Sequence, residues 1–188
     1  MSVIKHIGFL LLFGKALALQ AQTCYDNIPV TTPTSAFTIH NDGTASHHKT
    51  GLMWMRCQLG RDWNGSTCSD SGESYVWQDV LQSADSYSWQ SALQAADNII
   101  YAGYDDWRLP NKNELASIVE RSCVSPAINT TIFPNSYTGF TVLSSSPTVF
   151  YSNAIWTVDF DHGIVSTGIN TGVINDFRFK VRLVRGGD

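Results

Sequence analysis

Apolar and polar residues alternate most regularly near the end of the chain. Over residues 177–184, four apolar side chains alternate with Arg178, Lys180 and Arg182. A period of two is typical of a strand with one buried face. Shorter apolar runs with the composition of strands lie at residues 141–143, 155–160 and 164–165. The second half of the chain is therefore predicted to be mostly β-strand.

The first half contains one clear helical period. Spacings of three and four place a set of apolar residues on one helix face, namely Trp89, Ala92, Leu93, Ala96 and Ile100. Ser88 can cap the start of this helix, and Gly103 can end it. We therefore predict an amphipathic helix that begins near residue 89.

Residues 105–115 predict a second helix and the turn that leads into it. Pro110 disfavours helical backbone at the residue before it, so the entry is extended. Asn111 and Glu114 have the spacing of a capping box, in which each side chain bonds a backbone N–H of the other residue. The apolar residues on one side of this helix are Leu115, Ile118 and Val119. We expect the helix to stop before Cys123.

The strands of the first half are short. Residues 37–40 and 52–56 have strand composition, and turns are expected at Asn-Asp-Gly, residues 41–43, and Thr-Gly, residues 50–51. Residues 57–74 are rich in Gly, Ser and Asn and predict a surface loop. The fold class is therefore α+β, with two main helices from the first half packed on a mostly antiparallel sheet and long loops between elements.

The chain starts with a targeting pattern. A lysine and a histidine precede a short apolar run and then small residues, so residues 1–21 are predicted to be a cleaved secretory signal peptide. Lys15 interrupts the run too early for a membrane-spanning helix. Residues 22–36, with two prolines, predict an extended arm, and residues 37–188 have the length of a single domain. No integral membrane segment is expected after cleavage.

The charge balance excludes one large class of partner. The chain has 12 basic and 16 acidic residues, and two of the basic ones, Lys5 and Lys15, lie in the predicted signal peptide. The remainder therefore has 10 basic and 16 acidic residues, a formal charge of −6. Proteins that bind nucleic acid usually carry a strong basic excess or a basic stripe. Nucleic acid is therefore not an expected partner.

All four cysteines follow the predicted signal peptide, which favours two disulfides in an oxidising compartment. Four cysteines allow three connectivities. The short Gly/Ser/Asn-rich loop favours Cys57 with Cys68, which leaves Cys24 with Cys123. A zinc site is the alternative, but no two cysteines have Cys-x-x-Cys spacing. Disulfides are therefore the preferred interpretation.

Trp107 and Arg108 are the first candidates for ligand binding, because an aromatic ring and a guanidinium group can stack on sugars or pair with sulfates. A structural role is favoured, since Trp beside a sharp turn is usually buried. Arg108 can then bond carbonyl groups or a carboxylate such as Asp105 or Asp106. We expect this stretch to organise the fold.

Two further patterns have the residues for catalysis. Asp159 and Asp161 would share one strand face, where they could serve acid–base chemistry or hold calcium. Gly163 favours a simple polar turn there. The serines at 144–146 could supply a nucleophile with His162 as base, but they lack the Gly-x-Ser-x-Gly elbow and suit a strand end. Neither catalysis nor a metal or cofactor is expected.

The basic residues of the terminal strand form the only local concentration of positive charge. Arg178, Lys180 and Arg182, with Arg185 nearby, could grip an anionic glycan. The more ordinary interpretation is a solvated strand face paired with carboxylates. Polar and aromatic loop residues that could add ligand contacts are Tyr137, Tyr151, Asn153 and Asn170.

Five motifs occur together and in order: Thr-Gly-Leu-Met-Trp at 50–54, Asp-Trp-Arg-Leu-Pro-Asn-x-x-Glu-Leu at 106–115, Ser-Ser-Ser-Pro at 144–147, Trp-Thr-Val-Asp-Phe-Asp-x-Gly at 156–163 and Val-Arg-Leu-Val-Arg at 181–185. The chain thereby resembles the Lcl C-terminal domain family. The resemblance implies a bacterial module of the cell exterior, a fold similar to C-type lectins and formylglycine-generating enzymes, and binding of glycosaminoglycan-type carbohydrate. The Glu-Pro-Asn and Gln-Pro-Asp sugar motifs of calcium-dependent lectins are absent.

Together these observations predict a secreted, periplasmic or surface-exposed binding module without enzymatic activity, whose partner is a glycan or a cell-surface protein. A secreted hydrolase or modifying enzyme on the same fold, and a structural envelope component, are the alternatives. The residues expected to bind ligand are Tyr151, Asn153, Asp161, Arg178 and Lys180. Those expected to form the structural signature are Trp107, Arg108, Pro110, Asn111, Glu114 and Trp156.

Overall fold

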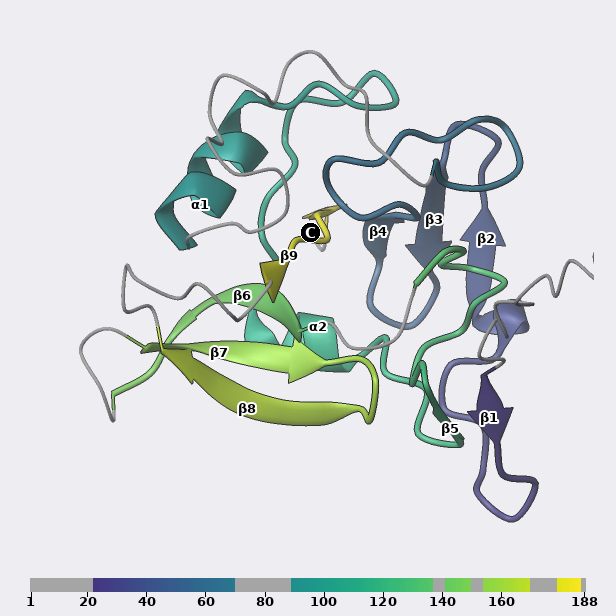
Figure 1. The fold of residues 1–188 in the computed structure, drawn as a ribbon. Helices are drawn as coiled ribbons and strands as arrows, with labels where there is room; N and C mark the ends of the chain where they lie inside the picture. Colours follow the sequence, from purple (N-terminus) through teal and green to yellow (C-terminus); the bar gives the residue numbers. More distant parts are fainter. Residues whose placement is uncertain (1–21, 70–88, 137–140, 150–153, 170–178, 187–188) are drawn as a thin grey trace, which may run out of the picture.

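The computed structural model describes residues 22–69, 89–136, 141–149, 154–169 and 179–186. Within them, three β-sheets and few helices make up the fold (Figure 1). The class is α+β, dominated by strands. Among these residues, no helix is long and apolar enough to cross a membrane.

One four-stranded sheet has the order β10-β4-β3-β2, with every pair antiparallel. Its strands are β2 (Phe37–Ile39), β3 (Thr44–His47), β4 (Leu52–Met55) and β10 (Val184–Gly186). The two predicted turns are present, but they enclose β3, a strand that the sequence did not indicate. Its residues, Thr-Ala-Ser-His, have little apolar character, and pairing with strands on both sides forms it.

The second four-stranded sheet has the order β8-β7-β6-β9. Its strands are β6 (Thr141–Pro147), β7 (Ala154–Asp159), β8 (Ile164–Ile169) and β9 (Phe179–Lys180). β9 runs parallel to β6, and the other two pairs are antiparallel. A third, two-stranded sheet joins β1 (Thr23–Cys24) to β5 (Cys123–Val124). The prediction of one sheet was wrong, because the strands separate into two large sheets and a small one.

The predicted terminal strand is divided between the two large sheets. β9 pairs with β6, whereas β10 pairs with β4, so residues 181–183 cross from one sheet to the other. Both alternating faces of this crossing segment are covered, and Arg182 is only 1% exposed. The expectation of a solvated basic face at Arg182 was therefore wrong.

Helix α1 (Trp89–Asn98) lies where the apolar period predicted it. Its buried residues are Ala92, Ala95 and Ala96. Ile100 is 77% exposed, contrary to prediction, while Ile99 packs against the core. The helix ends at Asn98, whose side chain donates to the Gln94 carbonyl, so Ile100 no longer follows the helical period.

Helix α2 (Lys112–Ala116) is a single short turn instead of a second main helix. The hydroxyl of Ser117 donates to the Glu114 carbonyl at 2.6 Å, and the backbone of Val119 then bridges Ile128. Strand-type pairing replaces helical bonding at this point. Leu115, Ile118 and Val119 are nevertheless all buried, as their spacing predicted.

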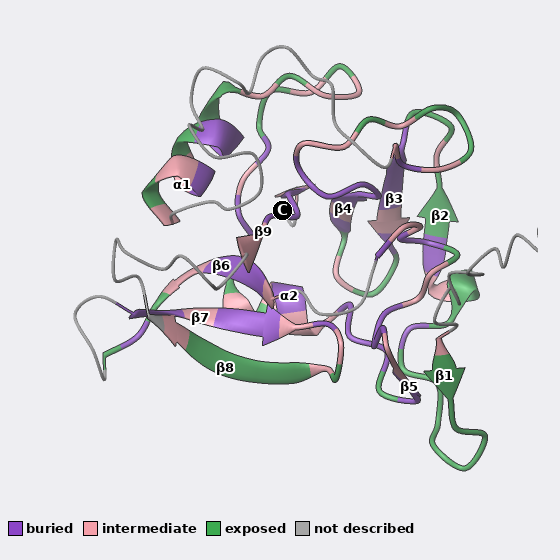
Figure 2. Ribbon diagram, in the orientation of Figure 1, coloured by how far each residue is buried: buried purple, intermediate pink, exposed green. Residues whose placement is uncertain are grey.

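Two buried clusters hold these elements together (Figure 2). The first includes Trp54 from β4, Leu115 from α2 and Val158 from β7, and so joins both large sheets. The second packs the alanines of α1 against residues such as Leu143 and Leu183. The exposed strand β8 forms one edge of the second sheet (Figure 2).

Candidate functional site

The stretch that leads into α2 is a structural joint. Arg108 makes two 2.8 Å hydrogen bonds to the Glu114 carboxylate. Asn111 and Glu114 form the predicted capping box. Burial would raise the pKa of Glu114, but its bonds with the Arg108 guanidinium and the Asn111 N–H outweigh burial and lower it. Trp107 is 2% exposed, and its indole N–H donates to the Tyr101 carbonyl.

This geometry confirms the structural interpretation and corrects one partner. Arg108 pairs with Glu114 instead of Asp105 or Asp106. Asp106 instead accepts from Arg185 at 2.6 Å. Arg108 also bridges to β10 through reciprocal backbone bonds with Val184. The joint thereby ties the start of α2 to the end of the chain.

The serines of β6 form hydrogen bonds with neighbouring elements through their hydroxyl or backbone groups. The hydroxyl of Ser144 donates to the Trp156 carbonyl at 2.6 Å, and the Ser144 carbonyl accepts from the Trp89 indole at 3.1 Å. The Ser145 N–H donates to the Pro110 carbonyl at 2.8 Å. The hydroxyl of Ser146 accepts from the Lys112 N–H at 3.0 Å. These bonds fit the predicted strand end.

His162 does not serve these serines as a base. His162 comes shortly after Asp159 of β7, which pairs with Thr141 at the start of β6. Thr141 lies roughly 10 Å along the strand from Ser144. The Nδ1 of His162 lies 3.1 Å from Asp159 Oδ2 instead. The hydrogen bond with Asp159 and the charge of Asp161 raise the pKa of His162.

Asp159 and Asp161 belong to a compact turn. Asp159 Oδ1 accepts from the Asp161 N–H at 2.8 Å, and the Asp161 carbonyl accepts from Ser125 N–H. Gly163 is at φ +72, and an added Cβ would approach Val119 to 2.8 Å. Across the residues that the structure describes, no three His, Cys, Asp or Glu side chains gather as a metal site. The backbone of the predicted ligand residue Asp161 therefore belongs to the turn, while its side-chain Oδ1 is buried without a hydrogen-bond partner.

Of the other predicted ligand residues, only Lys180 lies in the described part of the chain. Lys180 is half-buried in β9. Tyr151, Asn153 and Arg178 lie outside the described residues, as do Tyr137 and Asn170. Arg182 is buried, and its guanidinium group donates to the Met55 and Arg56 carbonyls at 2.9 and 2.6 Å. Burial lowers the pKa of Arg182 to about 9.

A small exposed surface combines a cation, an aromatic ring and hydroxyl groups. The ammonium group of Lys112 lies 4.1 Å from the centre of the Trp156 ring. Both side chains are partly exposed. Thr167 of β8 is exposed and pairs directly with Trp156, so both side chains project from the same face. We call Lys112, Ser146, Trp156 and Thr167 the Lys112–Trp156 platform.

The strands and the joint set the shape of this platform. Ser144 holds the Trp156 backbone and Ser146 holds the Lys112 backbone, so β6 keeps the ring and the ammonium group together. In the described ranges, Lys112 contacts no carboxylate. Sequence reasoning identified Trp156 only as a signature residue and did not consider Lys112. The only signal in the sequence was the position of Lys112 directly after the capping residue. Its proximity to Trp156 could be known only from the fold.

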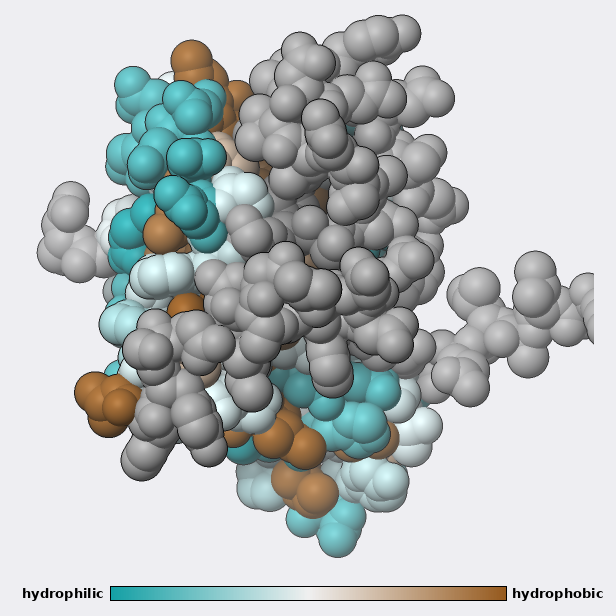
Figure 3. Space-filling view, turned by 60° about the vertical axis from the view of Figure 1, so that its left-hand side comes forward, coloured by the Kyte–Doolittle hydropathy of each residue, from teal (hydrophilic) through white to brown (hydrophobic). Residues whose placement is uncertain are grey.

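The side of the molecule turned forward in Figure 3 shows no single broad apolar area among its coloured residues. Hydrophilic residues and small hydrophobic groups are interspersed there.

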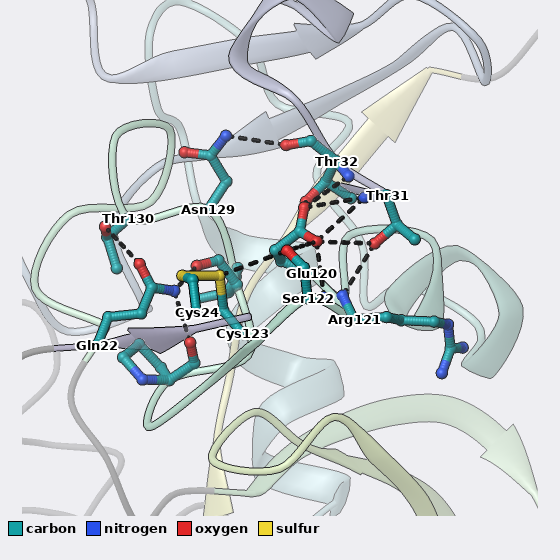
Figure 4. Close-up of a disulfide and its surroundings, with 12 residues drawn as sticks. Gln22, Cys24, Thr31, Thr32, Glu120, Arg121, Ser122, Cys123, Asn129 and Thr130 are labelled. Atoms are coloured by element: carbon teal, nitrogen blue, oxygen red, sulfur yellow. Dashed lines mark hydrogen bonds between the residues drawn. A yellow bond between two sulfur atoms is a disulfide. The ribbon is translucent and has the colours of Figure 1, made fainter. Parts of the chain in front are cut away.

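A second polar cluster, which we call the N-terminal clasp, holds the arm to the domain (Figure 4). The Glu120 carboxylate accepts from the N–H and hydroxyl groups of Thr31, Thr32 and Ser122, at 2.7–3.3 Å. Burial would raise its pKa, but these hydrogen bonds lower the pKa of Glu120 to about 2. The Cys24–Cys123 disulfide lies beside this carboxylate.

Side-chain amides complete the clasp. Gln22 donates to the Pro126 and Ile128 carbonyls at 2.6 and 2.7 Å, and Asn129 donates to the Thr32 carbonyl at 2.8 Å. The second disulfide joins Cys57 to Cys68. Both predicted pairings are confirmed. The clasp is enclosed and saturated with internal bonds, so its role is structural.

Comparison with known proteins places most of this fold in one family. Residues 43–185 match the Lcl C-terminal domain, which is well over half of the chain. No curated protein matches the chain. The matched region runs from the turn before β3 into β10, so it includes the joint and the platform but not the N-terminal arm of the clasp.

Proposed function

The chain belongs to the Lcl C-terminal domain family, and from that premise we propose that it is a non-enzymatic binding module of the bacterial cell exterior that recognises carbohydrate. The proposal includes secretion through the signal peptide at residues 1–21. It also includes a C-type-lectin-like arrangement of the domain, with glycosaminoglycan-type sugars as the ligand class that the family resemblance implies.

The observation that carries the proposal is the contact between Lys112 and Trp156. Aromatic rings bind the apolar C–H faces of sugars, and an ammonium group attracts their acidic or hydroxyl groups. The ammonium group lies over the ring, 4.1 Å from its centre, so a sugar residue would contact the part of the ring that the lysine leaves uncovered and reach the ammonium group from there. Ser146 and Thr167 add hydroxyl groups that can donate to or accept from sugar hydroxyls.

Binding is preferred to catalysis because the hydroxyl groups of Ser144 and Ser146 and the side chains of Asp159 and His162 have other partners. The serines of β6 hold Lys112 and Trp156, while Asp159 and Asp161 form a turn with His162. An active site needs converging titratable groups with a place for the reacting atom between them. The platform has one titratable group, which suits recognition.

The direct test is a glycan array with the chain from Gln22 onward, including heparin and chondroitin sulfate. We expect binding to some acidic glycans, weakened at least threefold in Lys112→Gln and in Trp156→Leu, as expected for loss of about 0.7 kcal/mol or more. Near-UV circular dichroism of each variant checks that the fold is retained.

Lys49→Gln is the matched control, because it removes the same charge from the turn between β3 and β4 and should leave binding unchanged. The proposal would be overturned if no glycan binds, or if both platform variants bind as tightly as the unmodified chain. Shortened glycan products after incubation would instead favour the secreted-hydrolase alternative.

A further inference from the structure

Two triplets of the chain have the Asn-x-Ser/Thr pattern of an acceptor for an N-linked glycan: Asn-Gly-Ser at 64–66 and Asn-Thr-Thr at 129–131. The glycan is attached to the side-chain nitrogen of the asparagine, so an acceptor must be exposed and its Nδ2 must be available. A three-residue pattern arises readily by chance. The surroundings of the two asparagines therefore decide whether either one can serve.

The first triplet lies within the short loop that a disulfide closes. Trp63 and Cys68 form a backbone bridge, and the Asn64 N–H donates to the Thr67 carbonyl at 3.1 Å. These contacts make residues 64–67 a tight turn with the disulfide at its base.

The turn presents this triplet to solvent. Asn64, Gly65 and Ser66 are all exposed. Gly65 has φ +96, a left-handed backbone that glycine adopts without strain, and a Cβ placed there would meet no atom of the described chain within 4 Å. The middle of the triplet is therefore open, so a transferase can approach the backbone on both sides of Asn64.

The oxygen of the Asn64 carboxamide is held, and its nitrogen is not. Oδ1 accepts from the Ser66 N–H at 3.0 Å, from the Ser66 hydroxyl at 3.1 Å and from the Thr67 N–H at 2.9 Å. Nδ2 donates to no group among the described residues. The bonds to Oδ1 thus fix the carboxamide against the Ser66 hydroxyl and leave Nδ2 available to react.

The second triplet has the opposite arrangement. Asn129 is only partly exposed, and its Nδ2 donates to the Thr32 carbonyl at 2.8 Å and to the Thr34 hydroxyl at 3.1 Å. Both partners belong to the N-terminal arm. A transferase would have to break both hydrogen bonds and displace the arm before it could reach this nitrogen. The fold therefore leaves the Nδ2 of Asn64 available and engages the Nδ2 of Asn129.

We propose that Asn64 is an acceptor for an N-linked glycan. The inference rests on the secretion included in the proposed function, because glycan transfer of this kind takes place on exported chains, and it does not depend on sugar binding by the platform. Asp62, two residues before Asn64, is also exposed and offers the transferase a carboxylate to bind. The corresponding residue before Asn129 is Ala127.

The transfer joins Asn64 Nδ2 to the anomeric carbon of a sugar that is carried on a polyprenyl diphosphate. The bond from that carbon to the diphosphate oxygen breaks, and the lipid diphosphate leaves with the electron pair. Nδ2 gives up one of its protons to a base of the transferase. The chain supplies only the acceptor nitrogen, so it needs no catalytic residue of its own.

The test incubates the purified chain from Gln22 onward, folded and with both disulfides intact, with a single-subunit oligosaccharyltransferase and a polyprenyl-diphosphate oligosaccharide. A short synthetic acceptor peptide in the same reaction shows that the enzyme is active. Peptide mapping by mass spectrometry then locates the glycan. We expect it on Asn64, with at least about tenfold lower occupancy at Asn129, because the hydrogen bonds of that nitrogen must break first.

Matched variants test the role of each group. Asn64→Gln and Ser66→Ala should abolish transfer, because each removes a group of the triplet. Ser66→Thr keeps the pattern and should keep the modification, and Asn129→Gln should leave the occupancy of Asn64 unchanged. Near-UV circular dichroism of each variant shows whether the fold is retained.

The inference is overturned if the peptide is glycosylated while Asn64 of the folded chain is not, or if Asn129 is glycosylated to the same extent. It is also overturned if Ser66→Ala is modified as fully as Ser66→Thr. None of these results bears on the glycan array, which tests the platform separately. The mass of the exported chain reports removal of residues 1–21, so a failure of the proposed secretion is seen independently of Asn64.

Discussion

The N-terminal clasp and the Lys112–Trp156 platform each contain one charged side chain, but the surroundings of the two charges are opposite in kind. In the clasp, the Glu120 carboxylate is 3% exposed and is surrounded by N–H and hydroxyl donors. In the platform, the Lys112 ammonium group is partly exposed and rests on an aromatic ring. Saturated buried charges contribute to stability, whereas exposed charges with spare bonding capacity are available to a ligand.

Among the changes considered, loss of the Cys24–Cys123 disulfide should lower the free energy of unfolding the most. The bond joins residues 99 positions apart, and removing a cross-link of that span costs about 5 kcal/mol by the chain-entropy argument. The double variant Cys24→Ala/Cys123→Ala should show this loss in urea denaturation. Glycan affinity below the denaturation range should stay unchanged.

The Cys57–Cys68 bond is a natural comparison, because it closes only 11 positions and should contribute about 3 kcal/mol. A loss below about 1 kcal/mol in the Cys24→Ala/Cys123→Ala variant would show that hydrogen bonds alone hold the arm.

Glu120→Gln should cost about 2–3 kcal/mol in the free energy of unfolding. The amide replaces one accepting oxygen with an NH₂ group that faces the N–H donors of the arm. Glu114→Gln is the matched change at a less buried acid, and it should cost about 1 kcal/mol. Equal losses in the two variants would contradict the special role of the clasp.

Acid should destabilise the protein through the same carboxylate. The pKa of Glu120 is lowered from 4.5 to about 2, so its contribution is complete above pH 4.5 and is lost as the pH falls toward 2. The contribution amounts to about 3 kcal/mol. Urea denaturation between pH 6 and 2 should show that the unmodified protein loses this stability as the pH falls, whereas the Glu120→Gln variant does not. Parallel curves for the two proteins would disprove this linkage.

Lys112→Gln should lower stability by only about 0.5 kcal/mol, because cation–π contacts at partly exposed sites are weak. Its effect on acidic-sugar binding should be larger than its effect on stability. Thermal denaturation and titration calorimetry measure the two quantities on one sample. A stability loss above about 2 kcal/mol would identify Lys112 as structural and remove the contrast with Glu120.

The smallest effect is expected at His162. Its pKa is raised above 6.5, so the interaction with Asp159 stabilises the folded state below pH 6.5 and is lost as the pH rises through the raised value. NMR titration of Asp159→Asn should move the His162 pKa back toward 6.5. An unchanged value would show that Asp159 does not hold the proton.

Local sequence patterns predicted much of this fold. The capping box at Asn111 and Glu114 depends on neighbours three residues apart, and the alanines of α1 follow one helical period. The disulfide of the short loop was also favoured by local composition. Such features need few long-range contacts, so their residues specify them directly.

Other predictions failed where distant segments compete for the same residues. Arg182 has the alternation of a half-exposed strand, yet its segment crosses between two sheets and is covered on both sides. Ile100 fits a helical face, but the helix ends before it. The length of α2 was overestimated because Val119 pairs with Ile128 instead of continuing the helix.

The sequence by itself indicated the family, the helix start after Asn111 and the mainly β character of the second half, and it favoured the Cys57–Cys68 disulfide, because each of these rests on local pattern or ordered motifs. Only the tertiary structure decided which charges are enclosed and which are available. Glu120 and Lys112 are eight positions apart, and neither stands out from the other in the sequence. Long-range packing encloses the first with Thr31 and Thr32 and leaves the second over Trp156, because burial depends on contacts between segments that are far apart in the chain.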